Sequence, residues 1–378
     1  MLKKRNCYRM REEKEMKKRM GILLSLAIMT STLTGCVGTP VVYHDCNCDQ
    51  CSSHAVKPDT DDKNNENNDN VSEGAVKTGL SVMVSLSEST NADAEKAGKA
   101  KYDITVVAVS VDDKGVIDSC LIDSIPATVS FDATGVITSD LTAAILTKNE
   151  LGENYGMKLY GGAKYEWNEQ AAALAKYAEG KTIAELKNGA VGEDGKAVDA
   201  DLASTATIYL GGYVSAIEEA VNQAQHLGAK KGDELRLATT SGVGSSKNAN
   251  GENAGLAQLD SDFVVMTMKD GIITSCYLDS VQAKVNFDAT GSITTDLSAD
   301  VLTKNELGEN YGMKAWGGSA YEWNEQAAAL AKYVTGKTIA DVTGIAVDDR
   351  TAPTDADLAS TVTIAVGGYK ALIEKAGK

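Results

Sequence analysis

Residues 165–177 read YEWNEQAAALAKY, and the same letters return at residues 321–333. A second string, TKNELGENYGMK at residues 147–158, likewise returns unchanged at residues 303–314. Both pairs are separated by 156 residues. Two identical strings at one constant shift indicate an internal duplication, and this duplication decides the fold.

The duplication extends well beyond these strings. At the shift of 156 residues the two copies align without a gap from Gly115 against Gly271 to Ile217 against Ile373. Each copy is much longer than the 20–50 residues of stacking repeats and can therefore bury a core of its own. We predict two tandem copies of one domain, at residues 79–227 and 228–378.

Within each copy the pattern predicts strands first and helices later. Apolar residues alternate along 80–86 and again along 104–108, which is typical of strands, and turn residues such as Asp270-Gly271 separate the runs. Residues 167–178 carry apolar side chains at helical spacing, and Gly180 follows as a stop signal. The sequence therefore predicts an α+β fold in which each copy packs helices on an antiparallel sheet.

The end of each copy fits two descriptions. In the first copy the β-branched Thr205 and Thr207 favour a strand. Gly211 and Gly212 could equally begin a closing helix. The same alternatives apply to residues 360–370 of the second copy.

The first 35 residues have the layout of a signal peptide, in which a basic segment precedes an apolar run at residues 21–34. This run is shorter than the about 20 residues that span a bilayer. The residues Leu33-Thr34-Gly35-Cys36 resemble a bacterial lipobox, which implies cleavage before Cys36 and lipidation of its thiol. We expect a protein anchored by lipid at the extracellular face of the cell membrane. An ordinary cleaved secretory signal is the alternative.

Residues 36–78 are predicted to form a disordered linker behind this anchor. Residues 59–70 contain only Asp, Asn, Glu, Thr and Lys, which cannot bury a core. A short tract of the linker could ligate zinc, copper or iron through its histidines and cysteines, namely His44, Cys46, Cys48, Cys51 and His54. The spacing fits no strong zinc pattern, so a reactive or disulfide-linked tract is an equal alternative.

Charge and composition exclude some classes of function. The chain has a net charge of −16, and its first 35 residues hold nine Lys or Arg against three Asp or Glu, so their removal would leave −22. Such a surface repels phosphate backbones, and we expect no nucleic-acid binding. No glycine-rich dinucleotide fingerprint follows a strand, which argues against a reductase. Each copy keeps one cysteine, Cys120 or Cys276, for which a buried, inert thiol is expected.

Each copy also contains the string Asp-Leu-Ala-Ser-Thr-x-Thr. This string resembles the attachment motif of the FMN-binding domain family, in which a flavin transferase joins the phosphate of FMN to the hydroxyl of the last threonine. The matching positions are Asp201, Ser204 and Thr207 in the first copy and Asp357, Ser360 and Thr363 in the second. Between Ser and Thr the family usually has Gly-Ala, whereas this chain has Thr205-Ala206 and Thr361-Val362. Glycine reaches φ values that threonine rarely adopts.

Together with the lipobox and the polar linker, the duplicated region is similar to the tandem FMN-binding lipoproteins of Gram-positive extracellular electron transfer. The resemblance covers residues 33–36 and about 79–378. It implies one covalent FMN per domain and an electron carrier rather than an enzyme that converts a substrate. Electrons would come from a membrane NADH dehydrogenase and quinone system and leave to extracellular acceptors such as ferric iron. The alternative is a flavin-free surface lipoprotein for binding or adhesion.

Further residues could contact the flavin. The block at 147–158 is polar and rich in glycine, so it predicts a shaped loop of the kind that carries binding residues. The candidates to flank the isoalloxazine ring are Lys148, Tyr155 and Met157 with their counterparts Lys304, Tyr311 and Met313. Tyr160 and Trp316, in matching glycine-flanked positions, could stack on a flavin face. Trp167 and Trp323 are expected in the core.

Overall fold

The computed structural model describes residues 74–378. The predicted signal peptide, Cys36, the Cys/His tract and nearly all of the predicted linker lie outside the described residues. Within the described part, no helix is both long and apolar enough to cross a bilayer.

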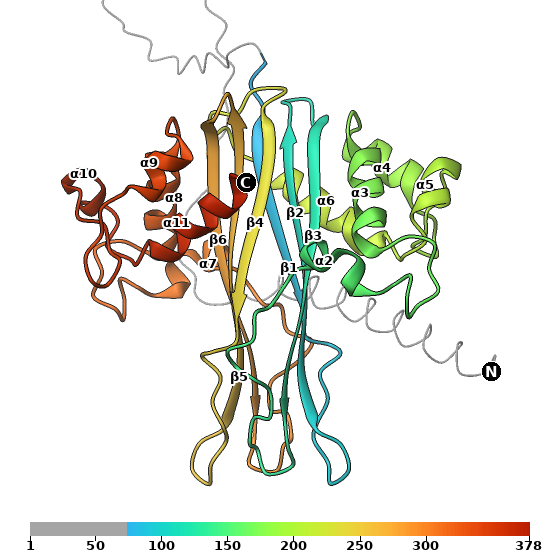
Figure 1. Ribbon diagram of the computed structural model, residues 1–378, viewed down its shortest axis with the longest axis vertical. Coiled ribbons are helices and arrows are strands. Elements are labelled where there is room, and N and C mark those ends of the chain that lie inside the picture. Colours follow the sequence, from blue (N-terminus) through green and yellow to red (C-terminus); the bar gives the residue numbers. More distant parts are fainter. Residues whose placement is uncertain (1–73) are drawn as a thin grey trace, which may run out of the picture. The chain divides into compact units, whose positions relative to one another are not determined.

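Each copy begins with a three-stranded antiparallel sheet in which consecutive strands are neighbours (Figure 1). The strands are β1 (Lys77–Ser85), β2 (Gly98–Val111) and β3 (Ile117–Phe131) in the first copy and β4 (Glu234–Gly242), β5 (Gly255–Lys269) and β6 (Ile272–Phe287) in the second. Helices follow each sheet, which confirms the predicted α+β class with antiparallel sheets.

The described part contains ten α-helices and two 3₁₀-helices. In the first copy they are α2 (Lys148–Leu151), η1 (Gly152–Tyr155), α3 (Trp167–Ala178), α4 (Ile183–Ala190), α5 (Ala200–Thr205) and α6 (Gly211–Asn222). In the second copy they are α7 (Lys304–Leu307), η2 (Gly308–Tyr311), α8 (Trp323–Val334), α9 (Ile339–Thr343), α10 (Ala356–Ala359) and α11 (Gly367–Ala376).

One sequence prediction is wrong and one ambiguity is settled. The block at 147–158 is helical at α2 and η1 instead of a loop, because Thr147 Oγ1 accepts a hydrogen bond from the Glu150 amide while the Glu150 carboxylate accepts one from the Thr147 amide. At the end of the first copy no strand forms between residues 204 and 214. The closing helix α6 begins at Gly211.

The two sheets share one core. One face of each sheet packs on the other sheet, and the largest side chains of this core include Tyr102, Phe131, Phe263 and Phe287. Helices α3 and α6 cover the outer face of the first sheet, and α8 and α11 cover that of the second (Figure 1). Residues 74–378 therefore belong to one compact unit in which each copy also keeps an apolar cluster under its own helices.

Matching hydrogen bonds join the copies in both directions. The Ala92 amide donates to Gly291 O at 2.9 Å, and the Ala249 amide donates to Gly135 O at 2.8 Å. In the same way the Ile293 amide donates to Asn91 Oδ1 at 2.8 Å and the Ile137 amide to Asn248 Oδ1 at 2.9 Å. The contact is therefore reciprocal, as in a two-fold symmetric interface.

Between aligned positions on the two long strands, the second copy is one residue shorter than the first. In the second copy, β5 and β6 are joined by Asp270-Gly271 alone, both with positive φ (50° and 79°), the conformation of a type I′ turn. Before this hairpin, equivalent positions lie 157 residues apart, because Gly98 pairs with Phe131 as Gly255 pairs with Phe287. Thr105 is therefore the counterpart of Asp262.

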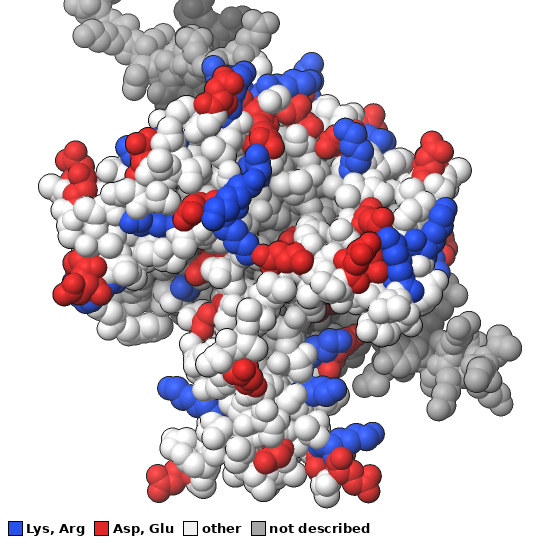
Figure 2. Space-filling model, viewed as in Figure 1, with Lys and Arg blue, Asp and Glu red and all other residues white. Residues whose placement is uncertain are grey.

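The visible face of the molecule carries both signs of charge. Figure 2 shows acidic and basic side chains interspersed over the described residues on this side. No broad basic patch of the kind that binds nucleic acid covers this face.

Candidate functional site

Thr207 lies in a short extended segment between two helices. Helix α5 starts because Asp199 Oδ1 accepts hydrogen bonds from the amides of Asp201 and Leu202, both at 3.0 Å. The chain leaves this helix at Ala206 (φ −115°, ψ 105°) and enters α6 at Gly211. Ala206 and Leu210 are buried, whereas Thr207 is exposed. The anchors on either side fix the segment and leave the threonine side chain on the surface.

A buried glutamine holds the threonine in place. Gln170 Oε1 accepts hydrogen bonds from the Thr207 amide at 2.8 Å, from Thr207 Oγ1 at 3.2 Å and from the Ile208 amide at 3.1 Å. Its Nε2 donates to Tyr165 O at 3.0 Å. Since Gln170 comes from α3, this single side chain ties the segment to the helix that covers the sheet.

The second copy repeats this geometry. Gln326 Oε1 accepts from the Thr363 amide at 2.8 Å, from Thr363 Oγ1 at 3.2 Å and from the Ile364 amide at 3.1 Å. Thr363 is exposed between the buried Val362 and Val366.

The neighbouring hydroxyls are turned away from this position. Ser204 Oγ donates to Asp201 O at 2.7 Å, and Thr205 Oγ1 donates to Leu202 O at 3.1 Å, so both hydroxyls bond to their own helix. Ser360 Oγ likewise donates to Asp357 O at 2.7 Å. Within the described residues no hydrogen bond joins the carboxylate of Asp201 to Thr207. The structure therefore separates Thr207 from the other members of the motif.

The departures from the family motif are compatible with the backbone. Thr205 is the last residue of α5, and the non-glycine residues with positive φ in the described part are Asp270 and Thr351. Neither Thr205 nor Thr361 thus occupies a conformation that requires glycine.

A cavity of about 400 Å³ lies beside the segment that carries Thr207. Its lining comes from β2, α2, η1, α3 and the start of α6, and consists of Thr105, Lys148, Tyr155, Met157, Trp167, Ile208, Tyr209, Gly212 and Tyr213. Three candidates from the sequence, Lys148, Tyr155 and Met157, thus meet at one cavity whose wall includes the residue next to Thr207.

Lys148 places a positive charge among aromatic rings. Its side chain is buried, with Nζ 5.4 Å from the ring centre of Tyr155 and 5.1 Å from that of Trp167. The Asp103 carboxylate lies 3.6 Å away. Trp167 Nε1 donates to Tyr213 Oη at 3.0 Å, and burial raises the pKa of that phenol. The cavity therefore combines flat apolar walls with one cation, which suits an aromatic ligand that carries negative charge.

The second copy differs in its electrostatics. Lys304 Nζ lies 5.1 Å from the ring centre of Tyr311 and 5.0 Å from that of Trp323, as in the first copy. At the position of Thr105, however, stands Asp262, which accepts a hydrogen bond from Tyr369 Oη at 3.2 Å. Burial and this carboxylate raise the pKa of Tyr369. The second copy thus has a carboxylate at the position where the first copy has the hydroxyl of Thr105.

Two aromatic candidates do not reach the cavity. The side chains of Tyr160 and Trp316 are both 83% exposed. Each ring lies over a glycine of the preceding turn, since a Cβ on Gly156 would come within 2.6 Å of Tyr160 and one on Gly312 within 2.3 Å of Trp316. They are exposed aromatic side chains at equivalent surface positions of the two copies.

Sequence reasoning missed several residues of the site. Gln170 and Tyr213 were not singled out, and Trp167 was assigned to the core alone. Trp167 is buried as predicted, but it also lines the cavity. Gln170 could have been recognised from its spacing. It follows Trp167 by three residues, so the helical period places this polar side chain on the buried face of the helix.

The two cysteines of the described part are buried free thiols. Burial raises the pKa of Cys276 to about 12 and raises that of Cys120 as well. Among residues 74–378 no group of three or more His, Cys, Asp or Glu side chains is arranged to hold a metal ion.

Comparisons of the chain with models of protein families, with curated proteins and with solved structures found no match.

Proposed function

We propose that this protein is an electron carrier, anchored by lipid at the extracellular face of the membrane, with one FMN esterified to Thr207 and one to Thr363. The observation that carries the proposal is the matched geometry of the two threonines. Each is exposed between buried anchors, and each is held through its amide and hydroxyl by a buried glutamine.

The residues around Thr207 fit an attached flavin phosphate. The adjacent cavity of about 400 Å³ has the size of a ligand pocket and offers the rings of Tyr155, Trp167 and Tyr213. Its wall also includes Gly212, in the first turn of the 12-residue helix α6. The first amides of a helix have no intrahelical partner and favour a phosphate.

The chain would attach and orient the cofactor, and FMN would supply the redox chemistry when bound. A phosphoester makes retention independent of affinity, which matters outside the cell because a dissociated flavin would diffuse away. The proposed route leads from a membrane NADH dehydrogenase and quinone system, through the two sites, to extracellular acceptors such as ferric iron. An acylated Cys36 would hold the protein at the bilayer along this route.

The decisive experiment is intact mass spectrometry of the full chain after co-expression with a flavin transferase. Wild-type protein should carry two flavin-phosphate increments, Thr207→Ala and Thr363→Ala one each, and the double variant none. Thr205→Ala serves as the matched control and should keep both. Colourless wild-type protein without a mass increment would reject the carrier in favour of a flavin-free surface binding or adhesion protein.

A further inference from the structure

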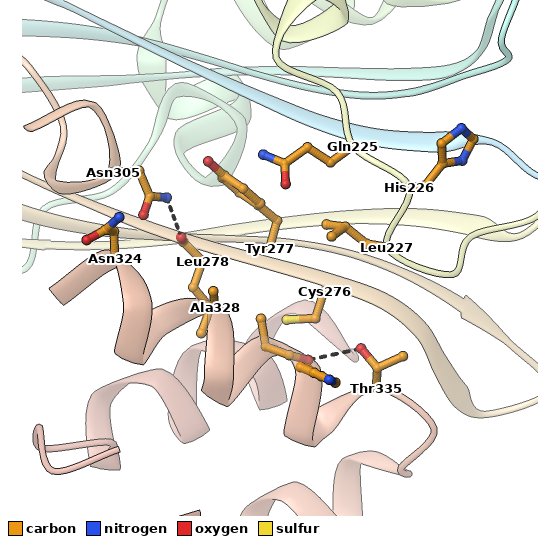
Figure 3. A pocket seen from close by; sticks show the side chains of 12 residues that line it. Gln225, His226, Leu227, Cys276, Tyr277, Leu278, Asn305, Asn324, Ala328 and Thr335 are labelled. Atoms are coloured by element: carbon orange, nitrogen blue, oxygen red, sulfur yellow. Dashed lines mark hydrogen bonds between the residues drawn. The ribbon is translucent and has the colours of Figure 1, made fainter. Parts of the chain in front are cut away.

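A second kind of cavity lies away from the threonine sites. In the second copy it measures about 450 Å³ and is enclosed by the edge strand β6, helix α8 and residues 225–227, which connect the two copies (Figure 3). The side chains of Leu227, Cys276 and Leu278 gather in its middle (Figure 3). Its volume lies in the range of small-molecule sites.

The first copy provides an internal comparison. A cavity of about 410 Å³ lies between β3 and α3, and nine of its lining positions coincide with those of the larger cavity at the shift of 156 residues. Most of these positions keep the same residue, including Cys120 and Cys276, Asn168 and Asn324, Ala175 and Ala331, and Lys176 and Lys332. The positions that differ therefore show what is specific to the second cavity.

The main difference is the loss of a carboxylate. In the first cavity, Lys176 forms an ion pair with Glu179, the C-cap residue of α3. The second copy has Thr335 at the position of Glu179, and its Oγ1 donates to Ala331 O at 2.9 Å. Within residues 74–378, Lys332 has no ion pair. No Asp or Glu lines the second cavity, whereas Asp123 and Glu179 both line the first.

Among the other polar side chains of the second cavity, Asn305 Nδ2 already donates to Leu278 O at 2.8 Å, whereas Asn324 can donate to a ligand. Asn324 Oδ1 is buried without a hydrogen-bond partner in the described residues. In Figure 3 the amide nitrogen of Asn324 faces the other labelled side chains and its oxygen points away from them. The hydroxyl of Tyr277 points toward Asn305 and Gln225, away from Cys276 and Leu278 (Figure 3). A ligand with acceptor oxygens would match a lining that combines donors with one free cation.

The lining of the cavity is elongated along helix α8. The lining residues from α8 and its C-cap extend from Asn324 to Thr335, which corresponds to roughly 16 Å along the helix at the standard rise. A volume of about 450 Å³ spread over this length is a narrow slot. Its apolar middle suits a hydrocarbon chain.

We propose that this slot binds an unbranched alkyl carboxylate, with the carboxylate at Lys332 and the chain along α8 among Leu227, Leu278 and Ala328. The Lys176–Glu179 pair makes the first cavity a poor site for the same ligand, because Glu179 would repel the incoming carboxylate. The proposal does not depend on flavin attachment.

The test is calorimetric titration of the full chain with octanoate, 1-octanol and octylammonium, each below its aggregation concentration. Octanoate should bind most tightly and octylammonium most weakly. Lys332→Gln and Thr335→Glu should each lower the affinity for octanoate about two- to fivefold, as expected for loss of a partly exposed ion pair. Neither variant should change the affinity for 1-octanol. Lys176→Gln is the matched control and should have no effect.

Two further variants test the location. Ala331→Trp should fill the slot and abolish binding of both octanoate and 1-octanol. Ala328→Leu is a smaller substitution that serves if Ala331→Trp disturbs folding, and it should weaken the binding of both ligands. Ala175→Trp, at the matching position of the first copy, should leave binding unchanged. Unchanged octanoate affinity in folded Ala331→Trp or in Ala328→Leu would place the ligand elsewhere. Unchanged affinity in Lys332→Gln, or no binding by the wild type, would overturn the proposal.

Discussion

The rings of Phe131 and Phe287 stack face to face, with centroids 4.1 Å apart and planes inclined by 2°. The two residues occupy the same position in the two copies and are fully buried. Their contact lies in the core that the two sheets share, so loss of either ring removes packing from both copies at once.

We therefore expect Phe131→Ala to lower the free energy of unfolding by about 3–5 kcal/mol, the usual cost of truncating a buried phenylalanine. Because the core is shared, the described part should still unfold in one transition. Chemical denaturation followed by circular dichroism would measure both quantities. Leu159→Ala, at a side chain that is 74% exposed, is the control and should change stability little. Separate transitions for the two copies would contradict the shared core.

Substitution of Gln170 by Met should impair flavin attachment at Thr207 alone. Methionine keeps the length of the side chain but cannot accept the three hydrogen bonds that fix Thr207 and Ile208. The partly buried amides of Thr207 and Ile208 left without a partner should cost about 1 kcal/mol of stability. Peptide mass spectrometry would compare Thr207 with Thr363, which remains intact in the same molecule and acts as the control. Full occupancy of Thr207 would show that Gln170 does not position it.

The two flavins should differ in reduction potential because Asp262 stands where the first copy has Thr105. A carboxylate near the cofactor disfavours added electrons, so Asp262→Thr should raise the potential of the second site. The reciprocal Thr105→Asp should lower that of the first. For a two-electron couple, a change of roughly 30 mV corresponds to 1.4 kcal/mol. Spectroelectrochemical titration of single-site proteins would measure both shifts, and the same sign in both variants would refute the explanation.

Stability should depend on pH through Asp279. Burial raises the pKa of this carboxyl to about 6, so the folded state holds its proton more tightly than the unfolded chain. Protonation of Asp279 therefore stabilises the folded state fully below about pH 4, and this stabilisation is lost as the pH rises to about 6. The free energy of unfolding should fall by about 3 kcal/mol across this range. Asp279→Asn should remove this contribution, seen as the difference between the two unfolding curves across that range.

Asp288 provides a control of opposite sign. The Thr290 hydroxyl and backbone amides lower the pKa of this exposed carboxyl, so any stability it contributes is present at neutral pH and lost on acidification. Asp288→Asn should therefore change the pH profile in the direction opposite to Asp279→Asn. Equal slopes for wild type and Asp279→Asn between pH 4 and 6 would disprove the role of Asp279.

The sequence predicted the order of elements because alternation and helical spacing are local signals. It missed helix α2, although Thr147 and Glu150 have the spacing of a capping box, since the polar and glycine-rich composition favoured a loop. It could not show what covers each sheet, because alternation of apolar residues identifies a buried face but not the element that packs on it. Gln170 was missed for a similar reason: its three acceptor contacts join residues 37 and 38 positions apart, which no local pattern encodes.

The reciprocal hydrogen bonds between Asn91 and Ile293 and between Asn248 and Ile137 have a consequence for the origin of the chain. A polypeptide with a single copy could form the same bonds and cover the same sheet face only by pairing with an identical molecule. The present arrangement is thus what fusion of an ancestral homodimer would leave. Because the two halves are separate stretches of one chain, each can carry residues that the other lacks, as Thr105 and Asp262 illustrate.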